Sequence, residues 1–310
     1  MSQSPVYLPF DAQVARVHDV APHLRRITLV GDDLRRCHER CLDRRVKILL
    51  PRHPGDALRD LPRGEDWYAD WLALPTDERP VMRTYTLRAV RPEVGEIDLD
   101  FVLHDEPGPA GAFAAGARPG DRLVVVGPVA GCVAAADAGI GWLPGRARQV
   151  LLVGDETAVP AIANIVGSLP RDTTGAVLVE VPADTDVPEL DAPPGLAVTV
   201  LARGEQPHGA QLVAAVRASC WSPFDAGERP AVRHHSPVDP TKTPSADPEP
   251  GEDSALWDTP TEPVTADHYA WLAGESTVIT TLRRHLVRER GWPRDRVAFM
   301  GYWRAGRAEC

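Results

Sequence analysis

The residues best suited to chemistry stand in two short motifs that combine cations, hydroxyls and carboxylates. The first is RTYT, in which Arg83 and Tyr85 would project from one face of a strand and Thr84 and Thr86 from the other. A guanidinium fork suits a pyrophosphate, whereas an aromatic ring with small hydroxyl donors suits the isoalloxazine ring of a flavin. A charged edge strand would show the same residues, so this motif alone leaves both interpretations open.

The second motif is VLLVGDETAVPAI at 150–162, where an apolar strand stops at Gly154 and a helix begins near Thr157. Backbone N–H groups and the helix dipole would then point outward at the carboxyl edge of a sheet, which favours an anion such as a nucleotide phosphate. Many strand–helix proteins contain such a turn. The glycines of GIGWLPG at 139–145 have the wrong spacing for a dinucleotide fingerprint and precede a strand, so we interpret them as a linker.

Cysteine content and charge exclude several other functions. Cys37 and Cys41 flank His38, but one such pair without a second does not predict a zinc site, and we expect no metal ligands. The formal net charge of −10 argues against nucleic-acid binding by bulk electrostatics. The sequence has no run of about 18 apolar residues and starts without a signal peptide, which predicts a cytoplasmic protein without membrane insertion.

The first part of the chain contains short β-branched runs separated by glycine, proline and aspartate clusters, and it ends near Pro128. The runs are VARVHDV, RRITLVG, RRVKILLP, MRTYTLRAV, EIDLDFVLH and DRLVVVGP. Their spacing predicts an antiparallel β-barrel, interrupted by a proline-containing insertion at 55–80.

From about Gly145 the pattern becomes strand followed by helix, as in HYAWLAG before TTLRRHLVRER. Repetition of this unit predicts a doubly wound parallel sheet. The sequence therefore predicts two domains, a barrel at 1–143 and an α/β domain at 144–310. Residues 222–264 carry nine acids, three bases and nine prolines without hydrophobic periodicity, which predicts a mobile acidic insertion.

Five motifs occur together and in order, and in this combination the chain resembles a known family. The motifs are RTYT at 83–86, DLDFVLHDEPGPAGAFAAGARPGD at 98–121, VGDETAVPAI at 153–162, LAGE at 272–275 and GYWRAG at 301–306. The chain resembles the siderophore-interacting proteins, FAD-dependent ferric-siderophore reductases of the ferredoxin-reductase-like superfamily. The resemblance covers nearly the whole chain apart from the acidic insertion. It implies a flavin-binding barrel followed by an NAD(P)H-binding domain.

The resemblance also implies which residues bind cofactors. For FAD it nominates Arg83, Thr84, Tyr85, Thr86, Phe101, Val102, His104, Gly111, Ala112 and Phe113. The family usually has a serine where this chain has Gly111, so a backbone N–H would replace a hydroxyl there. For NADPH or NADH it nominates Asp155, Glu156, Thr157, Arg203, Ala273, Gly274 and Glu275. Glu180 would disfavour a 2′-phosphate if it faced the ribose, and this leaves the choice between NADPH and NADH open.

By the same resemblance, Lys47 and Arg304 line the substrate site. An iron-loaded siderophore is oxygen-rich and often anionic, so a few cations would hold it without iron ligands from the protein. The expected reaction is hydride transfer from NAD(P)H to FAD and then one-electron reduction of the ferric siderophore, which releases Fe(II). The flavin carries the chemistry, so no catalytic side chain is expected, and we expect a monomer. Two alternatives remain: a general flavin or ferredoxin-type reductase, and a non-catalytic siderophore-binding flavoprotein.

Overall fold

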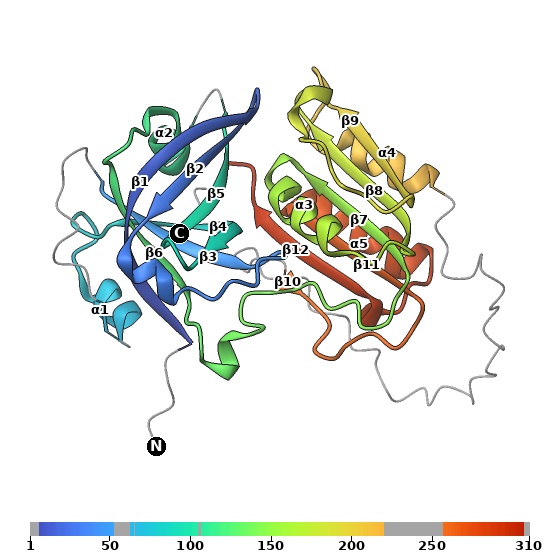
Figure 1. Ribbon diagram of the computed structural model, residues 1–310. Coiled ribbons are helices and arrows are strands. Elements are labelled where there is room, and N and C mark those ends of the chain that lie inside the picture. Colours follow the sequence, from blue (N-terminus) through green and yellow to red (C-terminus); the bar gives the residue numbers. More distant parts are fainter. Residues whose placement is uncertain (1–5, 53–62, 65, 105–106, 220–256, 307–310) are drawn as a thin grey trace, which may run out of the picture.

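A closed antiparallel β-barrel forms the first part of the molecule (Figure 1). The computed structural model describes residues 6–52, 63–64, 66–104, 107–219 and 257–306. The barrel strands are β1 (Tyr7–Ala21), β2 (Leu24–Val30), β3 (Arg45–Leu50), β4 (Val81–Arg91), β5 (Glu96–Val102) and β6 (Arg122–Pro128). They close in the order β1-β2-β5-β4-β3-β6, and all neighbouring pairs are antiparallel. The predicted barrel and its strands are confirmed.

Alternating apolar residues explain why these segments close into a barrel. Ile27 and Leu29 on β2, Ile48 on β3 and Leu99 on β5 have no exposed surface and meet in the barrel interior. Four short helical segments accompany the barrel: η1 (Asp32–Arg36), α1 (Trp67–Ala73), α2 (Pro109–Gly116) and η2 (Val133–Ala135). The predicted insertion at 55–80 thus contains a helix, α1.

A second sheet follows the barrel. Its strands are β7 (Gln149–Asp155), β8 (Thr174–Val181), β9 (Gly195–Ala202), β10 (Trp257–Asp258), β11 (His268–Glu275) and β12 (Val297–Trp303). The order is β10-β12-β11-β7-β8-β9, in which β10 is antiparallel to β12 and all other neighbours are parallel. The predicted parallel sheet is confirmed, and β12 adds a strand that the sequence pattern did not indicate.

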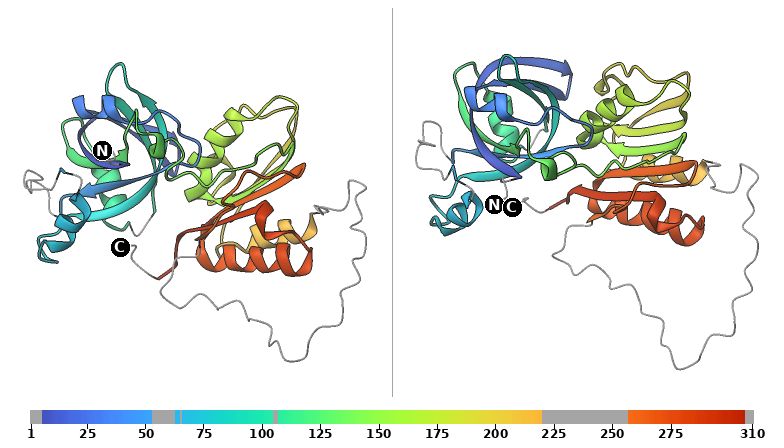
Figure 2. Two further views of the ribbon diagram at one scale, coloured as in Figure 1. Left: turned by 90° about the horizontal axis from the view of Figure 1, so that it is seen from below. Right: turned by 60° about the horizontal axis from the view of Figure 1, so that its bottom comes forward.

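Helices cover both faces of this sheet, as the two views in Figure 2 show. The helices are α3 (Val159–Ser168), α4 (Ala210–Ala218) and α5 (Ser276–Arg283), which continues into the π-helical η5 (Arg284–Glu289). Three short 3-10 turns, η3 (Glu156–Ala158), η4 (Asp184–Asp186) and η6 (Arg294–Arg296), lie in the connections of the described chain. Val150 and Leu152 of β7 pack in one core with α3, whereas Leu151 and Val153 pack in the other with α4 and α5. Within the part of the chain that the structure describes, no helix is long and apolar enough to cross a bilayer.

The predicted acidic insertion at 222–264 stays a prediction, but its C-terminal end takes part in the sheet. Residues 222–256 lie outside the described residues. Trp257 and Asp258, however, form β10 and pair with β12, and the Asp258 carboxylate binds Arg294 at 2.8 Å and Arg283 at 3.3 Å. Backbone pairing and two ion pairs therefore hold this end of the segment in the sheet.

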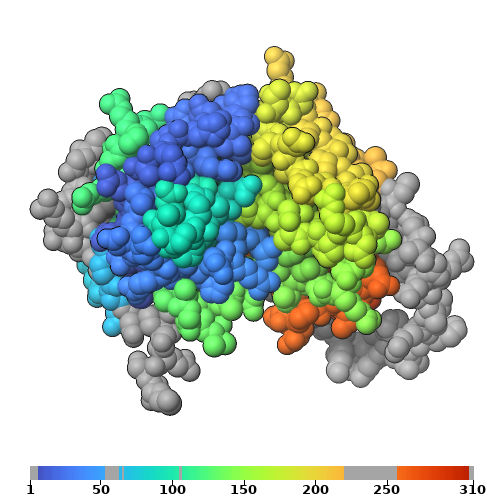
Figure 3. Space-filling model, viewed as in Figure 1, coloured from blue at the N-terminus to red at the C-terminus, as the bar shows by residue number. Residues whose placement is uncertain are grey.

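Asp43, just before β3, connects the barrel to the sheet. Its carboxylate accepts hydrogen bonds from the backbone N–H of Gly141 at 3.0 Å and of Trp142 at 3.2 Å, and from Nε1 of Trp271 on β11 at 2.8 Å. Figure 3 shows the blue and cyan barrel surface in contact with the yellow-green surface of the second part. The predicted boundary between 143 and 144 falls in the segment between β6 and β7 and stays a prediction.

Candidate functional site

The predicted flavin motifs converge on β4, β5 and α2. The ring of Tyr85 lies 4.3 Å from that of Phe101, and the ring of Phe113 lies 6.4 Å from Phe101 on centroid distances. Tyr85 and Phe113 are half-buried, whereas Phe101 is 0% exposed. Phe101 therefore has no surface of its own for a ligand and packs against the half-buried ring of Tyr85, while its predicted contact with FAD stays a prediction.

The other residues predicted to bind FAD differ in exposure. Arg83, Thr84, Val102 and Gly111 are half-buried, His104 and Ala112 are exposed, and Thr86 is buried. The Arg83 guanidinium donates a hydrogen bond to the carbonyl of Met82 at 2.7 Å. An aromatic face with a cation on the same strand fits the needs of an isoalloxazine ring and a pyrophosphate, so the residues present are suited to FAD.

The two cations predicted at the substrate site lie on different elements. Lys47 on β3 is opposite Thr84 in the register with β4, and its Nζ donates to Thr84 Oγ1 at 2.9 Å. Lys47 therefore shares a barrel face with the hydroxyl side of the RTYT motif. Arg304 follows the last residue of β12 and is exposed.

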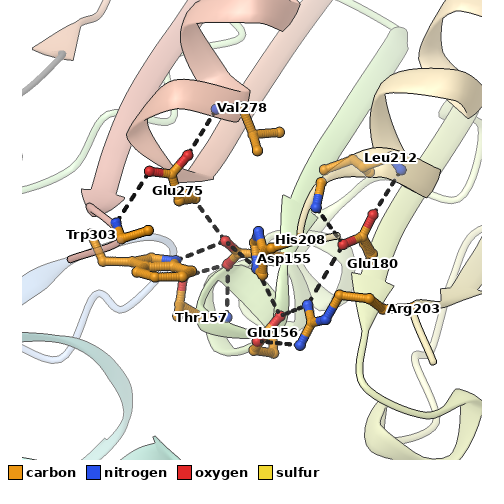
Figure 4. A network of polar contacts seen from close by, with 12 residues as sticks. Asp155, Glu156, Thr157, Glu180, Arg203, His208, Leu212, Glu275, Val278 and Trp303 are labelled. Carbon is orange, nitrogen blue, oxygen red and sulfur yellow. Dashed lines mark hydrogen bonds and ion pairs between the residues drawn. The ribbon is translucent and has the colours of Figure 1, made fainter. Parts of the chain in front are cut away.

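Asp155 ends β7 and forms the centre of a polar network at the carboxyl edge of the second sheet (Figure 4). Its Oδ1 accepts hydrogen bonds from the backbone N and Oγ1 of Thr157 at 2.9 and 2.5 Å. Its Oδ2 accepts from the backbone N of Glu275 and from Nε1 of Trp303, both at 2.9 Å. Because Asp155 is 1% exposed and both oxygens have donors, it holds the turn, β11 and β12 together rather than binding a ligand directly.

Arg203 pairs with Glu156 instead of extending outward. Its two terminal nitrogens donate to both oxygens of Glu156 at 3.0 and 2.9 Å, and the guanidinium is also 3.6 Å from Glu180. The Arg203 side chain is only 14% exposed. This placement argues against the predicted role of Arg203 as a nucleotide-phosphate ligand, because its charge already neutralises buried carboxylates.

His208 completes this network and was not singled out in the sequence. Its Nε2 lies 3.7 Å from Asp155 Oδ2 and 3.5 Å from Glu156 Oε2, and its ring meets Trp303 edge-on at 4.9 Å. Among the described residues, Asp155, Glu156 and His208 offer possible metal-ligand atoms within 4.8 Å of one another. Both carboxylates already have hydrogen-bond donors. No motif surrounds His208, so only its place just before α4 could have pointed to it.

Burial and neighbouring charges shift the pKa values in this network in opposite directions. Burial raises the pKa of Asp155, and the charge of Glu156 adds to the rise. Burial also acts to raise the pKa of Glu156, but His208 and Arg203 outweigh it and lower that pKa to about 2. Burial acts to lower the pKa of His208, whereas the two carboxylates raise it overall. Glu156 is therefore ionised at neutral pH and favours a protonated His208.

Glu180 and Glu275 hold the N-terminal ends of two helices. Glu180 is 0% exposed and accepts hydrogen bonds from the backbone N–H of Gly209 at 2.6 Å and Leu212 at 2.9 Å, at the start of α4. Because Glu180 is fully buried, its carboxylate offers no surface to a ribose, and the choice between NADPH and NADH stays open. Glu275 likewise accepts from the backbone N–H of Thr277 at 2.7 Å and Val278 at 2.9 Å, at the start of α5.

The predicted nucleotide residues Ala273 and Gly274 pack inward. Ala273 is 0% exposed. Gly274 has φ near +149°, and a Cβ there would lie 2.6 Å from Asp155 Oδ2. The close approach of β11 to the Asp155 carboxylate therefore requires a glycine at 274, and the predicted nucleotide contacts of these two residues stay predictions.

The two sets of predicted residues meet where the barrel contacts the sheet. The turn η3 lies against β5, and α3 lies against β4. At the end of β12, burial raises the pKa of the Tyr302 hydroxyl well above its usual range, and the neighbouring Trp303 donates to Asp155 of the GDET turn at 2.9 Å. The GDET, RTYT, DFV and GYW motifs therefore come together at one seam between the two parts.

Known proteins share this arrangement. A family model described as the siderophore-interacting FAD-binding domain matches residues 13–132, and one described as siderophore-interacting protein matches 147–306. The uncharacterised protein Rv2895c of Mycobacterium tuberculosis is 35% identical over 72% of this chain and 80% of its own length. Ferric vibriobactin reductase ViuB of Vibrio cholerae is 32% identical over 69% of this chain and 76% of its own length.

Solved structures agree with these matches. The crystal structure of the siderophore-interacting protein SipS from Aeromonas hydrophila aligns with a TM-score of 0.68 at 29% identity, over 98% of this chain and 94% of that one. A ferredoxin reductase of carbazole 1,9a-dioxygenase and the Amycolatopsis cytochrome P450 reductase GcoB, at 14% and 15% identity, share the fold alone. With both of its parts matched in order, the chain belongs to the siderophore-interacting protein family, and its barrel is the family's FAD-binding domain in a ferredoxin-reductase-like fold.

Proposed function

We propose that this protein reduces ferric siderophores with electrons from NAD(P)H, using FAD. The observation that carries the proposal is the seam, where η3 lies against β5 and α3 against β4, so that the predicted nicotinamide turn adjoins the predicted flavin strands. The relative named ferric vibriobactin reductase supports the same activity. FAD, when bound, supplies the ability to accept a hydride and return two electrons singly.

The electron balance requires one NAD(P)H for two ferric siderophores. NAD(P)H becomes NAD(P)+, one proton is released to solvent, and the two electrons reduce two Fe(III) to two Fe(II). The oxygen ligands of a siderophore hold Fe(II) less strongly than the harder Fe(III), so reduction favours release of the metal.

The side chains of this protein bind and orient in this proposal. Arg83 neutralises cofactor phosphate, and Tyr85 packs against the flavin ring. The Asp155 network holds Thr157 and Trp303 at fixed positions, which keeps the edge that receives the nicotinamide rigid. Lys47 and Arg304 attract the anionic siderophore.

Anaerobic absorption spectroscopy tests the proposal. The FAD-loaded protein is mixed with NADPH or NADH, and then with a ferric siderophore and a ferrous chelator. We expect the flavin absorption to bleach with nucleotide and to return as the ferrous complex forms. A bound flavin that neither nucleotide bleaches would refute the NAD(P)H reductase and leave the binding role. A flavin that nucleotide bleaches but ferric siderophore does not reoxidise would identify a reductase of another acceptor.

Variants of the two cations test the substrate site. Lys47→Ala and Arg304→Ala should each raise the KM for an anionic ferric siderophore about tenfold, the effect of one charge-assisted contact, and leave ferricyanide reduction nearly unchanged. Arg288→Ala is the matched control, because Arg288 is an exposed arginine on η5. Equal losses with both acceptors would show that these residues act on the fold or the flavin instead.

A further inference from the structure

Asn164 of α3 joins the sheet domain to the barrel through three hydrogen bonds. Its Nδ2 donates to the carbonyl of Leu42 at 2.8 Å and to the carbonyl of Leu87 at 3.0 Å. Its Oδ1 accepts a hydrogen bond from Nη1 of Arg88 at 2.8 Å. One amide thus uses both of its N–H groups and its oxygen on the barrel, and we call these contacts the Asn164 clamp.

The position of the Asn164 clamp links the two predicted cofactor motifs. Leu87 is the residue that follows RTYT on β4, and α3 begins at Val159 directly after the turn formed by η3. Asn164 lies five residues into that helix, which corresponds to about 7.5 Å along its axis. A helix is a stiff element, so a fixed distance between Asn164 and Leu87 also fixes the turn relative to the flavin strand.

Directional contacts are needed here because apolar packing alone does not fix how α3 is aligned with the barrel. Apolar surfaces between α3 and the barrel resist separation but tolerate small sliding movements, whereas three hydrogen bonds on one amide restrict both distance and angle. Asn164 and Arg88 also border an open groove of about 920 Å³ between the two parts, together with Trp142 and Ser168. The seam is therefore incompletely packed at the place where the clamp acts.

We infer that Asn164 is a positioning residue, which holds the nicotinamide turn against the flavin strand and thereby sets the rate of hydride transfer. The inference rests on the proposed function. Asn164 touches neither substrate nor cofactor in this scheme, and its effect passes through α3 and β4. A displacement of about 1 Å between reacting groups can lower a rate by up to about a hundredfold, so loss of the clamp should be readily measured.

Stopped-flow kinetics on FAD-loaded Asn164→Ala and Asn164→Asp test this inference. The aspartate has the same shape and keeps an acceptor for Arg88, but it loses both donors and places an oxygen against two carbonyls. In both variants we expect flavin reduction at saturating nucleotide to slow about tenfold or more, with the dissociation constants of FAD and nucleotide changed less than about twofold. Ser168→Ala is the control, because Ser168 lies on the same helix and donates only to the carbonyl of Ile165 at 2.7 Å.

The oxidative half-reaction distinguishes an effect on positioning from general damage to the fold. Reoxidation of the reduced flavin by ferricyanide needs only the barrel, so it should keep the wild-type rate in both Asn164 variants. Equal slowing of reduction and reoxidation, or a reduction rate within about twofold of wild type, would overturn the inference, since displaced reacting groups should slow reduction alone.

Hydrogen exchange tests the clamp independently of activity. In the FAD-loaded protein, Asn164→Ala should raise amide exchange in residues 83–88 and 155–168 relative to Ser168→Ala. If wild-type flavin is not reduced by nucleotide, the proposed function fails, and this comparison then decides whether the clamp exists. Unchanged exchange would overturn the inference whatever the outcome for the activity.

Discussion

Replacing Asp43 with alanine should strongly weaken the connection between the barrel and the sheet. The carboxylate is 1% exposed and receives two backbone N–H groups from the connecting segment and the indole N–H of Trp271. Burial raises the pKa of Asp43, and these three hydrogen bonds offset part of the rise. Alanine would leave three buried donors without an acceptor, each at a cost of about 1–3 kcal/mol. With partial relaxation and entry of water, we expect a loss of about 3–5 kcal/mol in the free energy of unfolding.

Urea unfolding of the FAD-loaded protein measures this loss. Tryptophan fluorescence, far-ultraviolet circular dichroism and flavin release should be followed together, because coincident transitions are required for a two-state free energy. Asp191→Ala is the control, since Asp191 is 88% exposed and pairs with an exposed arginine, so its loss should cost less than about 1 kcal/mol. A loss below about 1 kcal/mol for Asp43→Ala would refute the reasoning, because three buried N–H donors without an acceptor should lower the free energy of unfolding by more than that.

Three further predictions concern single side chains. Burial acts to raise the pKa of Asp98, but hydrogen bonds from Arg91 and Thr28 outweigh it and lower the pKa below 3.8. This carboxylate therefore stabilises the fold above about pH 4, and its contribution is lost as the pH falls through the folded pKa. Asp98→Asn should therefore cost about 1–3 kcal/mol at pH 7 and flatten the acid limb of stability, as measured by urea unfolding from pH 7 to pH 2; an unchanged acid limb would contradict this. Glu275→Gln should lower the free energy of unfolding by about 0.5–2 kcal/mol, because it removes the charge that caps α5. Urea unfolding measures this loss, and an unchanged free energy would show that the amide caps the helix equally well. Burial raises the pKa of Cys37 to about 12, so iodoacetamide at pH 8 should leave this thiol unmodified in the native protein and alkylate it after unfolding. Peptide mapping would detect the difference, and labelling of the native protein would mean that the thiol is accessible.

The fold was predictable because its two parts have different residue periods. Alternation of apolar and polar residues predicts the barrel strands, and repeated strand–helix units predict the parallel sheet. β10 was hidden because its two residues follow a proline-rich acidic segment, and a strand that short has no period to detect. β12 was not recognised because VAFMGYW is not followed by a helix within the described residues, so it did not repeat the strand–helix pattern.

The candidate site was predictable in its motifs but not in the contacts of its side chains. Phe101 could not be recognised as a core residue because β5 is buried on both faces, with Asp98 and Asp100 also covered, and alternation then fails to tell inside from outside. The pairing of Arg203 with Glu156 depends on which buried carboxylate faces it, a choice made by tertiary structure alone. His208 stands in a loop, where no period indicates the direction of a side chain.

The distribution of charge at the seam separates the roles of the two parts. Three carboxylates are buried at the sheet edge, and each accepts hydrogen bonds that hold a turn or the start of a helix: Asp155, Glu180 and Glu275. Arg203 and His208 are their internal counter-charges. In the proposed reaction this edge would receive the nicotinamide, although it offers little positive charge to an anion. Of the cations assigned to ligands, Arg83 and Lys47 lie on barrel strands β4 and β3, whereas Arg304 follows β12 of the sheet. In a chain of net charge −10, the proposed site would therefore attract an anionic ferric siderophore only locally, through Lys47 from the barrel and Arg304 from the end of β12.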